Sequence, residues 1–285
     1  MKKSAPALTL AAVALAATAG CSAGGSDPKP GTGSGGATTA EMGHIHGIGV
    51  DPHDGAVYAG THHGLFRIAD GSATRVADRV QDFMGFTVAG PEHFLASGHP
   101  GEGQDGPGSL GLIESTDAGQ TWHGLSLSGE ADFHSLEYRH GRVYGLNSVT
   151  GQLLVSTDMT SWQELSRAPI ADFAVSPTDA DLLIATTQEG LARSSDGGRA
   201  FEVVASAPLM VFVGWAEDGT LAGVTPEGVV YAADDPTGEW SERGSLGGQP
   251  EALTVQSSDE IYAAANGAVL LSTDGGRTFG PTLEE

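Results

Sequence analysis

An octapeptide that recurs at nearly regular intervals constrains the fold of this chain more than any other feature of its sequence. Ser-Thr-Asp-Ala-Gly-Gln-Thr-Trp at 115–122 returns as Ser-Ser-Asp-Gly-Gly-Arg-Ala-Phe at 194–201 and as Ser-Thr-Asp-Gly-Gly-Arg-Thr-Phe at 272–279. A shortened copy lies at 156–162, and degenerate copies lie at 231–240 and around Asp70. Six copies spaced by about 40 residues are typical of a repeat protein.

Short apolar runs precede each octapeptide and are separated by turn residues. In the first unit a turn at 50–55, Val-Asp-Pro-His-Asp-Gly, is followed by apolar runs at 56–60 and 64–68. Four short strands in each unit of about 40 residues are typical of a β-propeller blade. We therefore predict an all-β chain in which residues 43–285 form a single six-bladed β-propeller. The octapeptides would close the hairpin between the third and fourth strands of the blades.

The octapeptide resembles the Asp box, also called the BNR repeat. The whole chain resembles bacterial surface lipoproteins of the Asp-box propeller class, which are often labelled glycosyl-hydrolase-like or exo-sialidase-like. In such a turn an aspartate accepts backbone N–H bonds, glycine supplies a positive φ, and Trp or Phe packs between sheets. The resemblance therefore implies a structural role for the anchoring acids, which are Asp117, Asp158, Asp196 and Asp274.

The first 42 residues are predicted to be a targeting segment and a tether. Residues 1–20 combine a basic start with a short apolar run of small residues, as a secretory signal peptide does. The following Cys21, the only Cys of the chain, resembles the cysteine of a bacterial lipobox, although Thr18 stands where an aliphatic residue is usual. The resemblance implies lipidation of Cys21 and an extracytoplasmic anchor in the membrane; ordinary secretion is the alternative. Residues 21–42 are rich in Gly, Ser, Thr and Pro and are predicted to be flexible.

Composition excludes several classes of protein. One Cys cannot build a disulfide framework. The formal net charge of −23 disfavours nucleic acid as a partner, because such a surface repels phosphates, and it attracts cations.

Propeller connectivity predicts which side chains meet at one mouth of the central channel. The loops that precede the innermost strands and the loops between second and third strands share a face, opposite the octapeptides. The innermost strands of the first three blades begin His44-Ile45-His46, Asp82-Phe83-Met84 and Asp132-Phe133-His134. Because side chains two apart share a face of a strand, each polar pair is expected to point to the mouth. Further residues expected there are His62, His63, His99, Asp172, Met210 and Glu251.

This combination of imidazole, thioether and carboxylate predicts a transition-metal site. All 10 His lie between His44 and His140, in the first three predicted blades. Thioether favours copper, particularly Cu(I), over the alternatives zinc and nickel. The predicted ligands are His44, His46, Met84 and His134, with His99 and Glu251 as further candidates. A mouth that holds only water, with no cofactor, is the other interpretation of the same residues.

Two further functions remain open on the sequence. A glycoside hydrolase needs two carboxylates across a sugar site, and the candidates are Asp82, Asp132, Asp172 and Glu251. A standard sialidase is disfavoured because no three Arg fall at the predicted mouth. A protein-interaction scaffold with an envelope protein as partner would need neither metal nor catalysis. The favoured interpretation is a membrane-tethered, extracytoplasmic binding module that is not an enzyme and that binds a metal ion or small ligand.

Overall fold

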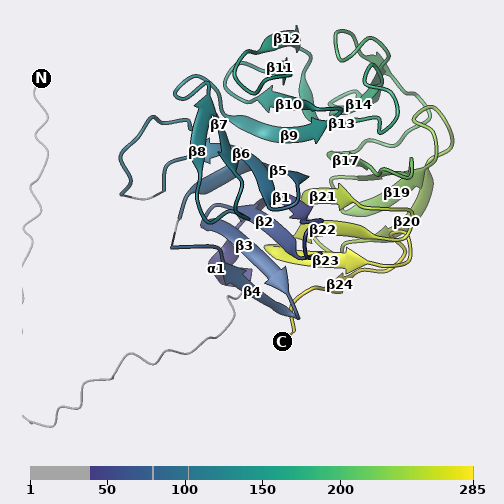
Figure 1. Cartoon of the computed structure of the whole chain (residues 1–285). Coiled ribbons are helices and arrows are strands. Elements are labelled where there is room, and N and C mark those ends of the chain that lie inside the picture. Colours follow the sequence, from purple (N-terminus) through teal and green to yellow (C-terminus); the bar gives the residue numbers. More distant parts are fainter. Residues whose placement is uncertain (1–38, 79, 102, 285) are drawn as a thin grey trace, which may run out of the picture. The chain divides into compact units, whose positions relative to one another are not determined.

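In the computed structural model the described residues are 39–78, 80–101 and 103–284. The predicted signal peptide, Cys21 and most of the linker lie outside them. The six sheets, with four strands each, form a six-bladed β-propeller, as predicted (Figure 1). After the short helix α1 (Thr39–Met42), blade one consists of β1 (Ile45–Val50), β2 (Val57–Thr61), β3 (Gly64–Ala69) and β4 (Ser72–Arg75).

The other five blades follow in chain order, and each is built from four consecutive strands. Blades two and three are β5 (Asp82–Gly90), β6 (His93–His99), β7 (Leu112–Ser115), β8 (His123–Ser126), β9 (Phe133–Arg139), β10 (Arg142–Asn147), β11 (Gln152–Ser156) and β12 (Gln163–Ser166). Blades four and five are β13 (Ile170–Val175), β14 (Leu183–Thr187), β15 (Gly190–Ser194), β16 (Glu202–Val203), β17 (Phe212–Trp215), β18 (Leu221–Val224), β19 (Val229–Ala233) and β20 (Ser241–Ser245). Blade six is β21 (Pro250–Val255), β22 (Ile261–Ala265), β23 (Ala268–Ser272) and β24 (Gly280–Pro281).

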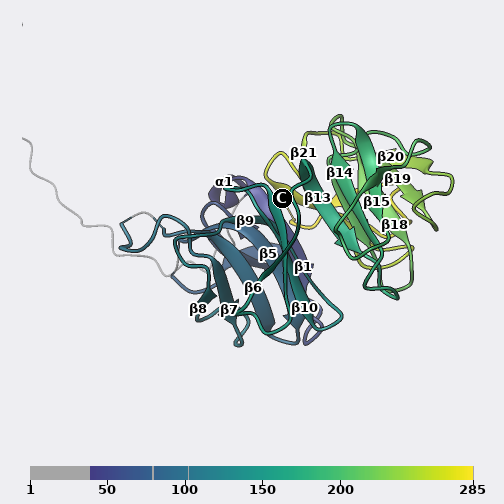
Figure 2. The ribbon, with the colours of Figure 1, turned by 90° about the horizontal axis from the view of Figure 1, so that it is seen from above.

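The second strand of a blade is buried on both faces, because neighbouring blades cover the sheet from either side. All five residues of β2 and all five of β22 are buried. Such a strand loses the strict alternation of a half-exposed sheet and becomes apolar or small throughout, as Ile-Tyr-Ala-Ala-Ala in β22 shows. Figure 2 shows the innermost strands β1, β5 and β9 beside one another.

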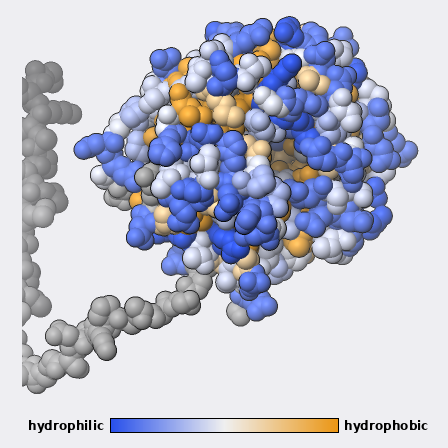
Figure 3. Space-filling view, viewed as in Figure 1, coloured by the Kyte–Doolittle hydropathy of each residue, from blue (hydrophilic) through white to orange (hydrophobic). Residues whose placement is uncertain are grey.

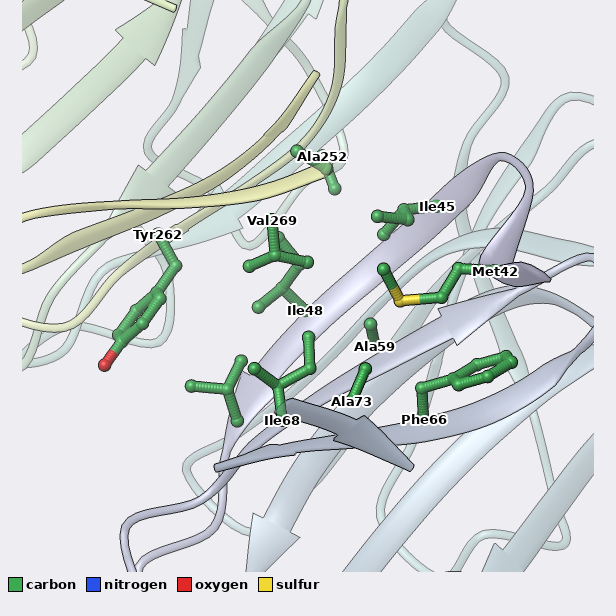
Figure 4. Packing of buried hydrophobic residues seen from close by; sticks show 12 residues of the cluster. Met42, Ile45, Ile48, Ala59, Phe66, Ile68, Ala73, Ala252, Tyr262 and Val269 are labelled. Carbon is green, nitrogen blue, oxygen red and sulfur yellow. The ribbon is translucent and has the colours of Figure 1, made fainter. Parts of the chain in front are cut away.

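The ring closes between blade six and blade one without a shared strand. Ile45 N donates to Glu251 Oε2 at 3.0 Å, and Thr254 Oγ1 donates to the carbonyl of Ile48 at 2.7 Å. Met42, at the end of the predicted linker, is fully buried, so the packed domain begins slightly before residue 43. The apolar contact at this seam joins Met42, Ile45 and Ile48 to Ala252, Tyr262 and Val269 (Figure 4).

A buried serine and an aspartate organise each complete octapeptide turn. Ser194 Oγ donates to Asp196 Oδ1 at 2.8 Å and accepts from Gly198 N at 2.9 Å. Asp196 Oδ1 also accepts from the backbone N–H groups of Arg199 and Ala200, both at 3.0 Å. The turns at 115–122 and 272–279 repeat the serine–aspartate–glycine pattern. The hydrogen bonds explain why Ser, Asp and Gly recur together.

The degenerate copy around Asp70 and the shortened copy use simpler turns. Asp70 and Gly71 both adopt positive φ (51° and 72°) and join β3 to β4 as a two-residue hairpin. In the shortened copy, Asp158 Oδ1 accepts from the N–H groups of Thr160 and Ser161.

Strand register places the octapeptides at the end of each blade that is remote from the predicted mouth. In blade two Asp82 pairs with His99 at one end, whereas Ser115, which opens the octapeptide, pairs with Phe94 near the other. In blade one Ile45 pairs with Thr61, so the residues next to them, His44 and His62, share the mouth end.

Loss of the serine is expected to destabilise a complete octapeptide turn more than the shortened turn. Ser194→Ala leaves the buried Gly198 N–H without an acceptor, which costs about 1–3 kcal/mol of unfolding free energy. Ser156→Ala, an equally buried serine in the shortened turn, should cost less, because the corresponding backbone N–H groups bond to Asp158 instead. Urea unfolding of the two variants measures the difference. Equal losses would contradict the role assigned to the serine.

Candidate metal site at the channel mouth

A β-bulge interrupts the innermost strand at the mouth in five of the six blades. In each of these strands one residue is skipped in the pairing with the second strand. The skipped residues are His46, Met84, His134, Ala171 and Glu251. A bulge bends its strand and redirects a side chain. Four of these five residues belong to the predicted ligand set. The bulge therefore gives the predicted ligands of different blades the same local backbone environment.

Three imidazoles from blade one converge at the mouth. The ring centroids of His44 and His46 lie 4.6 Å apart, and those of His46 and His62 lie 4.5 Å apart. One nitrogen from each ring lies within 4.8 Å of the other two, so this group can hold a metal ion. His46 is partly buried, while His44 and His62 are exposed. The rings of His44 and His46 thus lie against each other.

Asp82 of blade two fixes the orientation of His62. The Nδ1 atom of His62 lies 2.7 Å from Asp82 Oδ1. Because an ionised carboxylate only accepts hydrogen bonds, His62 Nδ1 carries a proton, which leaves Nε2 as the nitrogen available to a metal. That Nε2 lies 3.2 Å from Nε2 of His46. A carboxylate behind a ligating imidazole is the usual support of a metal-binding histidine.

His46 is neutral at physiological pH. Burial, followed by the neighbouring charges of His44, His62 and His134, lowers the pKa of His46 to about 3. Protons therefore do not compete with a metal for this ring except in acid.

The loop position of His62 predicts its place at the mouth, but the ligand set predicted from the sequence does not include it. The signal that identifies it is the antiparallel pairing of β1 with β2, which brings His62 N within 3.3 Å of the carbonyl of His44. A residue that follows the second strand thus lies beside one that precedes the first.

The other predicted ligands are not part of the three-histidine group. His134 Nε2 donates to Asp132 Oδ2 at 2.8 Å, and His99 Nε2 lies 3.6 Å from the same oxygen. Burial raises the pKa of Asp132, but the hydrogen bonds from His134 and Ser148 and the charge of His134 outweigh it, so the net shift is downward. Met84 is partly buried at the bulge of β5.

Glu251 serves the ring closure. Its Oε2 accepts from Ile45 N at 3.0 Å and its Oε1 accepts from Gly267 N at 2.8 Å. The bulge at Glu251 therefore turns a carboxylate toward backbone donors of blades one and six, and the structure does not bring it into the histidine group. Met210 is buried in the core between blades four and five.

Gly98 allows the two strands of blade two to meet at the mouth. Its φ is 146°, and a Cβ at this position would lie 1.9 Å from the carbonyl oxygen of Asp82. Only glycine permits this approach, which sets His99 opposite Asp82.

Below the mouth a central channel of about 640 Å³ passes the innermost strands and is lined by His46 and His134. Two of its carboxyl groups join neighbouring blades. Asp172 accepts from Ser135 Oγ at 2.8 Å and from Val213 N at 3.0 Å, and burial raises its pKa to about 6.

Glu137, the second of these carboxyls, accepts from Val175 N at 2.9 Å and from Arg139 Nε at 2.8 Å. Burial raises the pKa of Glu137 to about 7. Asp172 and Glu137 thus hold blades three, four and five together at the channel.

Comparison with known proteins supports the fold. No family model and no curated protein matches the sequence. A gluconolactonase from Xanthomonas campestris matches with a TM-score of 0.65 at 14% identity, covering 81% of this chain and 86% of that one. A chain of the nidogen–laminin complex matches with a TM-score of 0.65 at 10% identity, covering 80% of this chain and 93% of that chain.

Two further solved structures are similar. YCF48 bound to D1 peptide has a TM-score of 0.51 at 20% identity over 85% of this chain and 82% of that chain. A GH74 xyloglucanase from Xanthomonas campestris has a TM-score of 0.56 at 17% identity over 85% of this chain and 45% of its own length. At these identities the likeness establishes the β-propeller fold alone.

The raised pKa of Asp172 predicts a pH dependence of stability. Its folded pKa of about 6 exceeds the ordinary value of 3.8 for an aspartate, so between these values the folded state holds a proton that the unfolded state has released. Stability contributed by this proton is therefore lost as pH rises through about 6. Asp172→Asn should remove this loss, which is roughly 2 kcal/mol of unfolding free energy after allowance for solvent access. The amide can still form hydrogen bonds with Val213 N and Ser135 Oγ.

Urea unfolding between pH 4 and 8 is the measurement. Asp105→Asn, at an exposed carboxyl, is the matched control and should keep the pH profile of the parent. Parallel profiles for Asp172→Asn and the parent would show that Asp172 does not carry the effect.

Proposed function

We propose that this chain is an extracytoplasmic metal-binding module, with a transition metal held at the channel mouth by His44, His46 and His62. The observation that carries the proposal is the convergence of three ring nitrogens within 4.8 Å, one of them backed by Asp82 at 2.7 Å. Two nitrogens bound to one tetrahedral ion at about 2.0–2.1 Å lie roughly 3.3 Å apart. The Nε2 atoms of His46 and His62 are 3.2 Å apart.

Copper is the metal we propose, with zinc and nickel as competitors. Imidazole suits all three, and among divalent ions copper binds a given nitrogen site most tightly. Met84 occupies the bulge in blade two that His46 occupies in blade one, which offers a thioether from the neighbouring strand. The net charge of −23 supports cation capture by raising the local concentration of positive ions. Figure 3 shows that hydrophilic residues cover most of the face in view.

The role that fits these features is metal handling or sensing at the cell envelope. We propose that the chain is a BNR/Asp-box propeller, on the strength of its serine–aspartate–glycine turns, and that a lipid on Cys21 tethers it to a membrane. Among the described residues no helix is long and apolar enough to cross a bilayer. An envelope protein that delivers or receives the ion is the partner we propose.

Glycoside hydrolysis and a pure scaffold receive less support. All four candidate carboxylates already have hydrogen-bond partners. Asp82 bonds to His62, Asp172 to Ser135 and Val213, and Glu251 to Ile45 and Gly267. The fourth, Asp132, is buried and bonded to His134. The likeness to GH74 enzymes is one of fold, and we propose a non-enzymatic module.

The metal site is tested by copper binding to the purified full-length chain carrying Cys21→Ser, which removes the thiol as a competing ligand. We expect the double variant His44→Ala/His46→Ala to lose one equivalent of copper relative to this parent. His123→Ala, which removes an exposed histidine of β8, is the matched control and should bind as the parent does. Elemental analysis after desalting gives the stoichiometry. Equal copper content in the double variant and the parent would exclude the three-histidine site.

Asp82 provides a graded test of the same site. Asp82→Ala removes the group that orients His62, and such supporting residues typically contribute about 10- to 100-fold in metal affinity. Asp82→Asn should weaken binding less, because an amide oxygen still accepts from Nδ1. Competition with a chelator of known affinity measures both, and an unchanged affinity in Asp82→Ala would contradict the positioning role.

The lipid anchor is tested separately. Cells fed a labelled fatty acid should incorporate it into the chain and retain the protein in the membrane fraction. Cys21→Ala should abolish both signals. A labelled Cys21→Ala protein, or an unlabelled parent, would contradict lipidation at this residue.

A further inference from the structure

One carboxylate spans the seam between blades six and one next to the three-histidine site. Glu251 is the bulged residue of β21 in blade six, and His46 is the bulged residue of β1 in blade one. Glu251 Oε2 accepts from Ile45 N of blade one at 3.0 Å, and its Oε1 accepts from Gly267 N of its own blade at 2.8 Å. Each oxygen of this carboxylate therefore holds one backbone N–H group, on either side of the seam.

The peptide unit between His44 and Ile45 connects this carboxylate to all three imidazole-bearing residues. Its N–H donates to Glu251 across the seam, and its C=O accepts from His62 N at 3.3 Å. A trans peptide is planar, and its N–H and C=O point in opposite directions. The two hydrogen bonds therefore fix the orientation of a plane that follows His44, precedes His46 and meets the backbone of His62.

Burial makes the hydrogen bond from Ile45 to Glu251 hard to replace. Ile45 is fully buried, and its N–H points away from β2, toward the edge of the sheet that has no further strand. A buried donor without an acceptor costs free energy, so loss of the carboxylate would favour displacement of this peptide. On the other side Glu251 is held by the turn at Asn266 and Gly267, whose positive φ values of 53° and 74° join β22 to β23 as a two-residue hairpin.

Blade three shows that the fold itself does not require a carboxylate at this position. Phe133 precedes the bulged His134 as Ile45 precedes His46, and its N–H donates to Ser97 Oγ of blade two at 3.0 Å. A neutral hydroxyl thus satisfies the equivalent donor in a blade whose bulged histidine is not part of the three-histidine group. Hydrogen bonds to an ionised carboxylate are roughly twice as strong as neutral ones. The stronger anchor therefore lies beside the proposed metal ligands.

We propose that Glu251 is a positioning residue of the copper site, and that copper binding in turn tightens the seam between blades six and one. The inference rests on the proposed function, because it assigns Glu251 a role toward His44, His46 and His62. A binding site needs its ligands held within about 0.5 Å of the productive geometry. All three histidines are tied to one peptide unit, and Glu251 determines where that unit lies.

The coupling acts in both directions. If the hydrogen bond to Glu251 favours the peptide orientation that binds copper, then bound copper favours the orientation that makes this hydrogen bond, because linkage is reciprocal. Copper held by the three-histidine group should therefore reduce local separation of blade six from blade one. This effect reaches β21, a strand that carries none of the three histidines.

The positioning role is tested by the copper affinity of the full-length Cys21→Ser chain, measured by competition with a chelator. We expect Glu251→Ala to lower the affinity about 10-fold or more, as loss of a supporting residue typically does, and still to bind one equivalent at saturating copper. Glu251→Gln should lie between this variant and the parent, since one amide oxygen replaces two carboxylate oxygens. Thr254→Val is the matched control, because it removes the other seam hydrogen bond, to the carbonyl of Ile48, without touching the His44–Ile45 peptide. It should keep the parental affinity.

Two further readouts separate positioning from a purely structural role. The electron paramagnetic resonance spectrum of bound Cu(II) should change in Glu251→Ala and match the parent in Thr254→Val. Hydrogen exchange followed by mass spectrometry should show that copper slows exchange in β21 of the parent but not of Glu251→Ala, with β13 of blade four as the internal reference. Circular dichroism checks that each variant is folded, and Glu251→Gln decides the question if the alanine variant is not.

The outcomes distinguish this inference from the proposed function. Equal copper affinity in the Glu251 variants and the parent, or equal losses in Glu251→Ala and Thr254→Val, would overturn the positioning role. The copper site would still stand in that case, provided that His44→Ala/His46→Ala loses the ion. A parent that binds no copper would overturn both.

Discussion

Mutual burial of neighbouring sheets is the constraint on which this molecule depends. A four-stranded blade has two apolar faces and cannot bury either alone, so the blades must form a closed ring. Because each blade is built from consecutive strands, no strand exchange closes the circle. The seam relies instead on Met42, on side-chain packing, and on hydrogen bonds from Ile45 to Glu251 and from Thr254 to Ile48.

This closure is connected directly to the proposed copper site. Ile45, whose N–H is bound by Glu251, lies between His44 and His46 in the chain. Blade six therefore anchors the backbone that carries two of the three imidazoles, while Asp82 of blade two orients the third. The site geometry is thus determined by three blades, although blade one alone supplies the ligands. Such support from rigid strands is what holds a metal site in place.

The repeated bulge explains how a structural repeat acquires different functions in different blades. The same extra residue is His in blades one and three, Met in blade two, and Glu in blade six. Blade six uses this position to hold its neighbour, whereas blades one to three present it at the mouth. The octapeptide turns lie at the opposite end of the blades, so the mouth can vary without disturbing the hydrogen bonds that close the hairpins.

Much of this arrangement follows from sequence. The period of about 40 residues and the apolar runs determined six all-β blades, and antiparallel connectivity determined that His44, His46, His99 and His134 lie at one mouth. Only the tertiary structure decided which of them form a group: His62 joins His44 and His46, His134 pairs with Asp132, and Glu251 turns to the backbone. The reason is physical. Strand alternation determines from which face of the sheet a side chain projects. Contacts of 3–5 Å between side chains at the mouth depend on bulges and ring orientations, which no local pattern specifies.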